Sequence, residues 1–373
     1  MRAAPLRSTF LALCASLLVL ACGTDHGGGG VQATQGTPPG EPVPALPPVG
    51  APMTGLTANA WTWVPFDDSQ CDDGSPTGLG VNLGDSAELI VFLDGGGACW
   101  NFVTCAAPEV SRHGPWREQD MLARAAGFGG TLFDRSDPQN PFRTWSFVFV
   151  PYCTSDVHSG DQATTYSAPD GSHHTFQHRG RANAIAFGRR IAATFPQAPK
   201  VVIAGASGGG YGAFVNYDSL RRYWPASKAY LLDDSGPALV GLPVPAERDA
   251  WWAAWGTPAV LTTFCPDCTT DLSAGWTALS RRWPSDRIAL LSSMQDEVIR
   301  TFLLTGPTIF EGALRLTRAQ VIGPLPNVQT FFVAGNSHTM VAAPANFTAD
   351  GEGLREWLAQ MVSDDPAWQS RGP

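Results

Sequence analysis

The chain has 373 residues, of which 44% are hydrophobic and 15% are charged, with 40 Gly and 31 Pro. This composition indicates a loop-rich globular protein of enzyme size and argues against a disordered chain or a coiled coil. The net charge is −9 and the 24 Lys and Arg are scattered, which argues against nucleic acid as a partner because phosphate binding needs clustered cations.

The N-terminus has the features of an export signal. Arg2 and Arg7 precede the apolar segment 10–20, which is too short to span a bilayer and has the length of a secretory h-region. It runs into Val19-Leu20-Ala21-Cys22, which resembles a bacterial lipoprotein box. We therefore expect residues 1–21 to be a signal peptide and Cys22 to carry a lipid anchor in the membrane. Ordinary cleavage near Ala21, which would release a soluble protein, is the alternative.

Two further regions follow the signal. Residues 22–52 are rich in Gly and Pro, a composition that buries little apolar surface and behaves as an extended tether. Residues 53–373 contain no internal repeat or second low-complexity break, so they are expected to form one catalytic domain. Gly23 in place of Asp favours sorting of the lipoprotein to an outer membrane.

Short apolar runs alternate with longer helix-compatible segments in the predicted domain. The predicted strands are 88–93, 145–150, 201–204, 228–232, 287–291 and 328–333, and the predicted helices include 180–195, 212–224 and 353–362. Apolar runs without strict alternation suit strands that are covered on both faces. The sequence therefore predicts an α/β protein with a doubly wound, mostly parallel sheet and helices on both faces. Segment 241–282 lies between two of these predicted strands, so we expect it to be a cap insertion.

The motif Gly205-Ala-Ser207-Gly-Gly209 directly follows the predicted strand 201–204. A serine hydroxyl becomes an effective nucleophile when a sharp strand-to-helix turn lifts its Oγ out of the sheet, and flanking glycines permit that tight turn. The pattern also occurs by chance in Gly/Ser-rich loops, but the strand before it and the helix-compatible run after it favour a nucleophile elbow. Ser207 is therefore the predicted nucleophile.

A run of three glycines follows the predicted strand 88–93 at its carboxyl end, which is where doubly wound sheets place their chemistry. Acyl transfer needs backbone N–H donors around the developing oxyanion, one after the nucleophile and others from the loop after an early strand. Gly96, Gly97 and Gly208 fit these roles. Taken alone, the glycine run is more typical of a tight turn.

His338 follows the last predicted strand, which is where α/β hydrolases place the base of the triad. Asp296 lies beyond the strand 287–291, and its carboxylate would accept the Nδ1–H of the histidine and stabilise the imidazolium. Asp234 is the competing acid, because it follows the strand after the nucleophile helix. The chain order Ser207, Asp296, His338 favours Asp296.

At this point the chain resembles the pectin acetylesterase family over about residues 88–345. The shared segments, in order, are Phe92–Cys99 with Cys105, Val150–Asp161, His178–Arg181, Gly205–Gly209, Gln295–Glu297 and Ser337-His338. The family includes plant pectin acetylesterases and the animal carboxylesterase Notum, which removes a fatty acyl group from Wnt proteins. The resemblance implies an α/β-hydrolase-type esterase with Ser207, Asp296 and His338 as its triad and Gly96, Gly97 and Gly208 as its oxyanion hole. It departs from the family pattern at Ala98-Cys99-Trp100 and at Cys153–His158, near the pocket, so the substrate does not transfer with the mechanism.

Eight cysteines are present, and six remain once Cys14 leaves with the signal and Cys22 is lipidated (8 − 2 = 6), an even number that suits an oxidising compartment. The resemblance implies the disulfides Cys71–Cys153, Cys99–Cys105 and Cys265–Cys268. The last pair also suits a redox dithiol or half a zinc site, but no second pair completes four zinc ligands. His173, His174 and His178 are more typical of a solvated loop that leads into a helix than of a metal cluster. No metal or cofactor is expected.

Three classes of function follow. The leading one is a serine carboxylesterase that removes acyl groups, above all acetyl, from an extracellular polysaccharide such as pectin through an acyl-enzyme at Ser207. A lipid or fatty-acyl esterase is the second, and a non-catalytic surface lipoprotein is the third. The complete triad and glycine run argue against the third. We expect an exported protein, either a cell-envelope lipoprotein of the outer membrane or an extracellular enzyme.

Overall fold

The computed structural model describes residues 45–373, so the predicted signal peptide and Cys22 lie outside the described residues. The described residues belong to one compact unit. None of their helices has the length and apolar character needed to span a bilayer.

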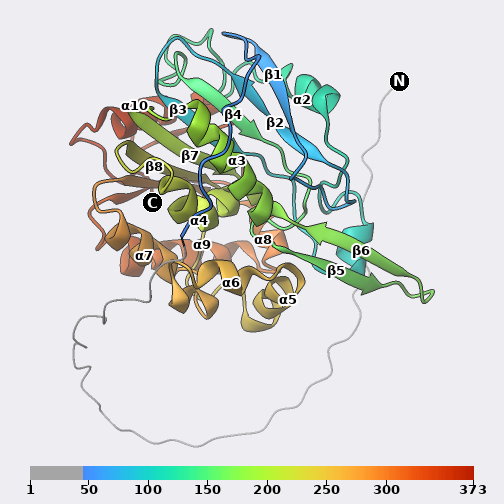
Figure 1. The fold of residues 1–373 in the computed structure, drawn as a ribbon. Helices are drawn as coiled ribbons and strands as arrows, with labels where there is room; N and C mark the ends of the chain where they lie inside the picture. The colour runs from blue at the N-terminus through green and yellow to red at the C-terminus, as the bar shows by residue number, and fades with distance from the viewer. Residues whose placement is uncertain (1–44) are drawn as a thin grey trace, which may run out of the picture. The chain divides into compact units, whose positions relative to one another are not determined.

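An eight-stranded sheet runs through the molecule in the order β1-β2-β4-β3-β7-β8-β9-β10 (Figure 1). Strands β3, β4 and β7 to β10 are mutually parallel, whereas β2 is antiparallel to both of its neighbours. The mostly parallel α/β fold predicted from the sequence is confirmed. The strands are β1 (Trp61–Phe66), β2 (Thr77–Asn82), β3 (Leu89–Leu93), β4 (Ser146–Val150), β7 (Lys200–Ala206), β8 (Lys228–Asp234), β9 (Arg287–Ser293) and β10 (Val328–Val333).

Two small sheets lie apart from the main one. They are a hairpin of β5 (Gln162–Ser167) and β6 (His173–His178), which projects from the body of the molecule, and the short pair β11 (Thr348–Ala349) and β12 (Glu352–Gly353) (Figure 1). The α-helices are α1 (Phe102–Ala106), α2 (Glu118–Ala125), α3 (Gly180–Thr194), α4 (Gly208–Arg221), α5 (Pro245–Trp255), α6 (Thr257–Leu261), α7 (Ala274–Arg282), α8 (Glu297–Phe302), α9 (Pro307–Thr317) and α10 (Leu354–Ser363). Three short helical turns are η1 (Pro266–Thr269), η2 (Arg318–Ile322) and η3 (Pro344–Asn346).

Both faces of the sheet are covered, because successive side chains of each strand point to opposite sides. In β3, Leu89, Val91 and Leu93 join a core that includes residues of α3, α4, α7 and α9. Ile90 and Phe92 join a second core with residues of α2 and α10. This two-sided burial explains why the strands read as continuous apolar runs.

The end of the predicted tether lies against the domain. Gly50 N donates to Arg189 O at 3.1 Å, and Arg189 Nε donates to Pro48 O at 2.8 Å. Tyr223 OH donates to Pro47 O at 3.2 Å. Residues 47–50 are therefore held on α3 and the residues just after α4.

Candidate active site

Ser207 sits at the junction of β7 and α4, with φ 59° and ψ −124°. A positive φ is uncommon for a residue with a side chain and marks a strained turn. A Cβ on Gly209 would lie 2.0 Å from Leu93 O, and one on Gly205 would lie 1.9 Å from Gly209 O. A side chain at Gly209 would therefore clash with β3, and one at Gly205 would clash with the turn itself, so both positions require glycine.

The glycine run after β3 lies beside this turn. A Cβ on Gly208 would lie 3.2 Å from Gly97 O, and one on Gly95 would lie 2.8 Å from Ser207 Cβ. Gly97 has φ +77°, and a side chain there would meet Val110 O at 1.9 Å. Among the hydrogen bonds of residues 45–373, none uses the N–H of Gly96, Gly97 or Gly208 as a donor. The two segments that carry these N–H groups meet at the Ser207 turn.

Neighbouring segments hold the glycine run in place. The Tyr152 hydroxyl donates to Gly97 O at 2.8 Å and accepts from Val157 N at 2.8 Å. Arg112 N donates to Gly96 O at 2.7 Å, so the run is also bonded from its other side. Sequence patterns alone assign Tyr152 no role, although it lies just after a predicted strand.

His338 and Asp296, two of the predicted triad residues, lie within hydrogen-bond distance of each other. His338 Nδ1 lies 2.9 Å from Asp296 Oδ2 and 3.0 Å from Oδ1. Asp296 is fully buried and caps α8, where its Oδ1 accepts from Val298 N and Ile299 N at 3.0 Å each. Between residues 45 and 373, no hydrogen bond joins Ser207 Oγ to the ring of His338. Among the described residues, the structure thus joins two of the three predicted triad side chains, Asp296 and His338, by a hydrogen bond and does not join His338 to Ser207.

Asp234, the competing acid, contacts the main chain next to His338 and not its Nδ1. Its Oδ2 accepts from Met340 N at 2.7 Å and from Val341 N at 2.8 Å. Burial raises the pKa of Asp234 to about 6, and these bonds and the nearby His338 partly offset the rise. Of the two candidate acids, the structure brings only Asp296 to the Nδ1 of His338.

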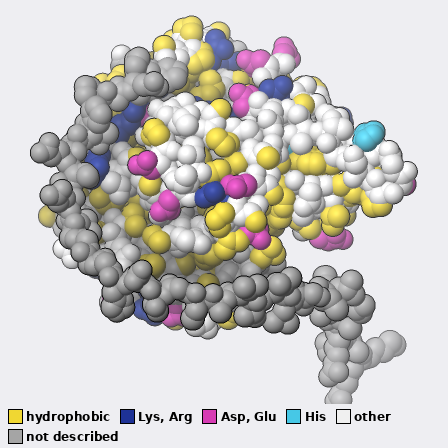
Figure 2. Space-filling model, turned by 90° about the horizontal axis from the view of Figure 1, so that it is seen from below, with side chains coloured by type: hydrophobic (Ala, Val, Ile, Leu, Met, Phe, Trp, Pro, Cys, Tyr) yellow, Lys and Arg dark blue, Asp and Glu magenta, His cyan; other side chains and the backbone are white. Residues whose placement is uncertain are grey.

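A cavity opens from Ser207 and is almost entirely apolar. Its walls include Trp100, Trp251, Trp252, Trp255, Phe302 and Leu303, together with Gly97 and Gly208. Arg248, the charged residue among the described lining, pairs with Asp249 Oδ1 at 2.9 Å. Segment 241–282, the predicted cap, supplies several of these walls through α5 and α6. A space-filling view from below Figure 1 shows hydrophobic side chains across that face, interrupted by scattered charges (Figure 2).

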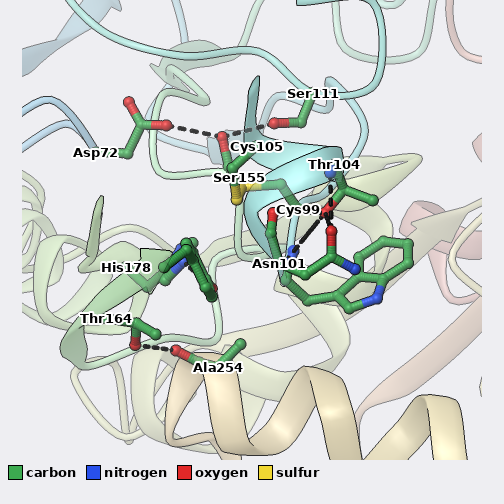
Figure 3. Close-up of a disulfide and its surroundings, with 12 residues drawn as sticks. Asp72, Cys99, Asn101, Thr104, Cys105, Ser111, Ser155, Thr164, His178 and Ala254 are labelled. Carbon is green, nitrogen blue, oxygen red and sulfur yellow. Dashed lines mark hydrogen bonds between the residues drawn. A yellow bond between two sulfur atoms is a disulfide. The ribbon is translucent and has the colours of Figure 1, made fainter. Parts of the chain in front are cut away.

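The three disulfides join Cys71 to Cys153, Cys99 to Cys105, and Cys265 to Cys268, the pairing that the resemblance implied. His178 lies beside the Cys99–Cys105 bond (Figure 3), and a nitrogen of its ring and the two sulfurs lie within 4.8 Å of one another. The disulfide leaves neither sulfur as a thiolate, which is the form that binds metal.

The histidines of the hairpin differ from the expectation. His178 is buried, and its ring nitrogens lie 3.0 Å from Thr154 O and 3.0 Å from Tyr166 OH. Burial lowers the pKa of His178 to about 4. His173 and His174 were expected on a solvated loop, but they begin strand β6, because that segment pairs residue by residue with β5. Their side chains are exposed, as expected.

A buried carboxylate organises the turn after β4. Asp156 accepts from Thr154 Oγ1 at 2.6 Å and from the N–H groups of His158, Gly160 and Gly180 at 3.0, 3.1 and 2.7 Å. Burial raises its pKa to about 7, against the effect of these bonds. This turn carries Val157, which lines the cavity. Sequence patterns alone do not single out Asp156, and its contact with Gly180 N comes from 24 residues away.

Comparison with known proteins gives a consistent set of relatives. Pectin acetylesterase 11 of Arabidopsis thaliana is 24% identical over 170 residues, which are 44% of this chain and 42% of that protein. The palmitoleoyl-protein carboxylesterase NOTUM of Homo sapiens is 29% identical over 178 residues, which are 44% of this chain and 34% of that protein. The chain thus spans less than half the length of these relatives.

A shorter relative is covered more completely. The inactive palmitoleoyl-protein carboxylesterase notum1b of Danio rerio is 33% identical over 98 residues, which are 26% of this chain and 68% of that protein. Residues 62–240 match the family model described as Pectinacetylesterase. That range contains the glycine run, the Ser207 turn and Asp234, and on this evidence the chain belongs to the pectinacetylesterase family.

Proposed function

We propose that this chain is a serine carboxylic ester hydrolase in which Ser207 forms an acyl-enzyme. The observation that carries the proposal is the strained Ser207 turn beside three free glycine N–H groups. The His338–Asp296 pair adds a base whose Nδ1 is held by a buried carboxylate. The printed names of the relatives, pectin acetylesterase and carboxylesterase, describe the same reaction class.

The geometry supports the following reaction. His338 Nε2 takes the proton of the Ser207 hydroxyl while Oγ bonds to the ester carbonyl carbon. The carbonyl oxygen becomes an oxyanion that accepts from Gly96, Gly97 and Gly208, and these oriented donors favour the charge of the transition state. The C–O bond to the alcohol then breaks, and the alcohol leaves with the proton from His338. Water then attacks the acyl carbon while His338 takes its proton. The bond from the acyl carbon to Oγ breaks, His338 returns the proton to Ser207 Oγ, and the acid is released.

The cavity favours an acyl group longer than acetyl. Its aromatic and aliphatic walls begin at Ser207, and an alkyl chain gains about 0.8 kcal/mol for each methylene group buried in such surroundings. A lipid or fatty-acyl ester is therefore the substrate class that the lining supports best. A short acyl ester of a polysaccharide is the second candidate, because relatives named pectin acetylesterases match the same region.

Export is part of the proposal. Three disulfides suit an oxidising compartment, and the signal and lipid box at Cys22 would place the enzyme on a cell-envelope membrane. Radiolabelled palmitate supplied to cells that express the full chain should label the wild type, and Cys22→Ser should lose the label.

A series of p-nitrophenyl esters from acetate to palmitate, assayed with wild type and Ser207→Ala, tests the function. We expect kcat/KM to rise from acetate to medium or long chains, because each added methylene is buried against the cavity walls. Ser207→Ala should lower kcat by about 10⁴-fold or more. Ser363→Ala, at an exposed serine in α10, is the control and should match wild type. Retained activity in Ser207→Ala would refute the nucleophile, and a preference for acetate would favour the polysaccharide substrate.

A further inference from the structure

We infer that Asp234 is a positioning residue that ties the nucleophile turn to the loop of the base. Its main-chain carbonyl holds Ser207, and its carboxylate holds the residues directly after His338. The inference rests on the proposed function, since it assigns a role within the same site.

The main-chain contact is at the strand end. Strand β8 lies between β7 and β9, and Asp234 stands in register with Ala206 on one side and Leu291 on the other. Asp234 O accepts from Ser207 N at 2.7 Å. A bond at the nitrogen of Ser207 fixes the residue whose positive φ presents the hydroxyl, so the strained turn is held by the neighbouring strand.

The carboxylate makes the second contact. Asp234 Oδ2 accepts from both Met340 N and Val341 N, at 2.7 and 2.8 Å, and its Oδ1 accepts from Ser235 Oγ at 3.1 Å. Asp234 is fully buried. Hydrogen bonds to an ionised acceptor are about twice as strong as neutral ones. Without the carboxylate of Asp234, the N–H groups of Met340 and Val341 would lose this acceptor.

The loop between β10 and residue 341 is held at both ends. Its first part is bonded to α8 and the residues just before it, through Gln295 N to Gly335 O at 2.9 Å, Glu297 N to Asn336 O at 3.2 Å and Asn336 Nδ2 to Glu297 Oε2 at 2.9 Å. At its far end Val341 O accepts from Leu132 N at 3.0 Å, and the N–H groups of Met340 and Val341 are held by Asp234. Thr339, just after His338, has φ +61°. His338 therefore lies between an anchor at α8 and a strained residue whose far side is fixed by Asp234.

The charges around Asp234 fit this role. The nearby titratable groups are His338 on the loop and Asp233 on the same strand. Burial holds the pKa of Asp233 well above its usual range, which favours the uncharged form of this neighbouring carboxyl.

The variant Asp234→Asn tests the inference. It keeps the size of the side chain but removes the anionic acceptor, so the two N–H groups lose a charged partner. We expect kcat to fall by about 10- to 100-fold, because small displacements of catalytic groups cost this much. KM should stay within about twofold, since Asp234 does not line the cavity. The matched control is Asp233→Asn, which replaces the neighbouring buried carboxyl, whose Oδ1 accepts from Gly236 N at 2.8 Å. It should keep kcat within about twofold of wild type.

The outcomes separate the two proposals. Equal kcat in Asp234→Asn and wild type, or equal losses in both variants, would overturn the positioning role. An active Ser207→Ala variant would instead refute the proposed function, whatever the kcat of Asp234→Asn. A measurement on wild type covers a variant that does not fold: with ¹⁵N-methionine labelling, the amide hydrogen of Met340 should exchange slowly with solvent, because Met340 N donates to Asp234 Oδ2 at 2.7 Å. A Met340 amide that exchanges as fast as an exposed amide would also overturn the inference.

Discussion

At the scale of single residues, the candidate site was predicted mainly from residues that lie just after a predicted strand. Ser207, Asp296 and His338 each follow a strand of the parallel sheet, and the carboxyl ends of such strands meet at one edge. Their order could therefore be read from the chain, and the structure brings Asp296 to His338. The contacts of Asp234 and Tyr152 could not be read, because they depend on which backbone groups approach from more than 50 residues away.

The substitution Asp296→Asn should separate catalysis from stability. Asparagine caps helices as well as aspartate does, so α8 should keep its first turn and the free energy of unfolding should change by less than about 1 kcal/mol. The amide cannot favour the correct tautomer of His338 in the same way, and kcat should fall by about 10³- to 10⁴-fold. Steady-state kinetics and urea unfolding measure the two quantities. A variant with wild-type kcat would show that another group orients His338.

At the scale of elements, the six parallel strands were predictable and the first two strands were not. Strand β1 contains Pro65, and β2 contains Gly78 and Gly80, residues that are depleted in strands. Packing explains them: β1 is an edge strand, where proline is tolerated. A Cβ on Gly78 would lie 2.2 Å from Val64 O, and one on Gly80 would lie 2.6 Å from Met121 Cε. These are tertiary requirements that local propensity does not reveal.

Glycine substitutions test the packing of the nucleophile turn. Gly209→Ala places a Cβ where Leu93 O lies 2.0 Å away, so the turn must move, and we expect lower stability and a loss of esterase activity. Gly312→Ala is the matched control, because it lies in α9 with nothing within 4 Å of the new Cβ. It should stabilise the protein by about 1 kcal/mol through helix propensity. Thermal unfolding and activity of both variants check this, and a Gly209→Ala protein as stable and active as wild type would contradict it.

At the scale of the whole molecule, the layered fold followed from the apolar runs, but the placement of the cap did not. The hairpin reaches the end of α5, where Thr164 Oγ1 donates to Ala254 O at 2.6 Å and Gln162 Nε2 donates to Ala253 O at 2.6 Å. The indole of Trp255 donates to Cys99 O at 2.7 Å. These bonds join segments about 90 to 160 residues apart, and no local sequence pattern predicts them. The sequence places Trp251, Trp252 and Trp255 in the cap, but only the fold shows that they line a cavity.

Buried carboxyl groups should make the stability of the whole molecule depend on pH. Burial raises the pKa of Asp156 to about 7 from 3.8, so between about pH 4 and 7 the folded protein keeps a proton that the unfolded chain has lost. The contribution of Asp156 to stability is therefore present at low pH and is lost as the pH rises towards 7, by about 1.4 kcal/mol per pH unit.

Urea unfolding of wild type and Asp156→Asn at pH 5 and pH 7 measures this contribution. The variant has no proton to lose at this position, so the stability advantage of wild type over Asp156→Asn should shrink from pH 5 to pH 7. The other titrating groups are common to both proteins and cancel in the difference. A gap of constant size would show that Asp156 is ionised throughout this range.

The walls of the cavity and the proposed hydrolytic groups belong to different parts of the fold. Ser207, Asp296 and His338 follow strands of the sheet, whereas Trp251, Trp252 and much of the acyl cavity belong to helices inserted between β8 and β9. Replacements in the inserted helices would reshape the room for the acid portion of an ester and leave the strand ends untouched. A scaffold divided in this way allows descendants of one ancestor to acquire different substrates while conserving a single chemistry.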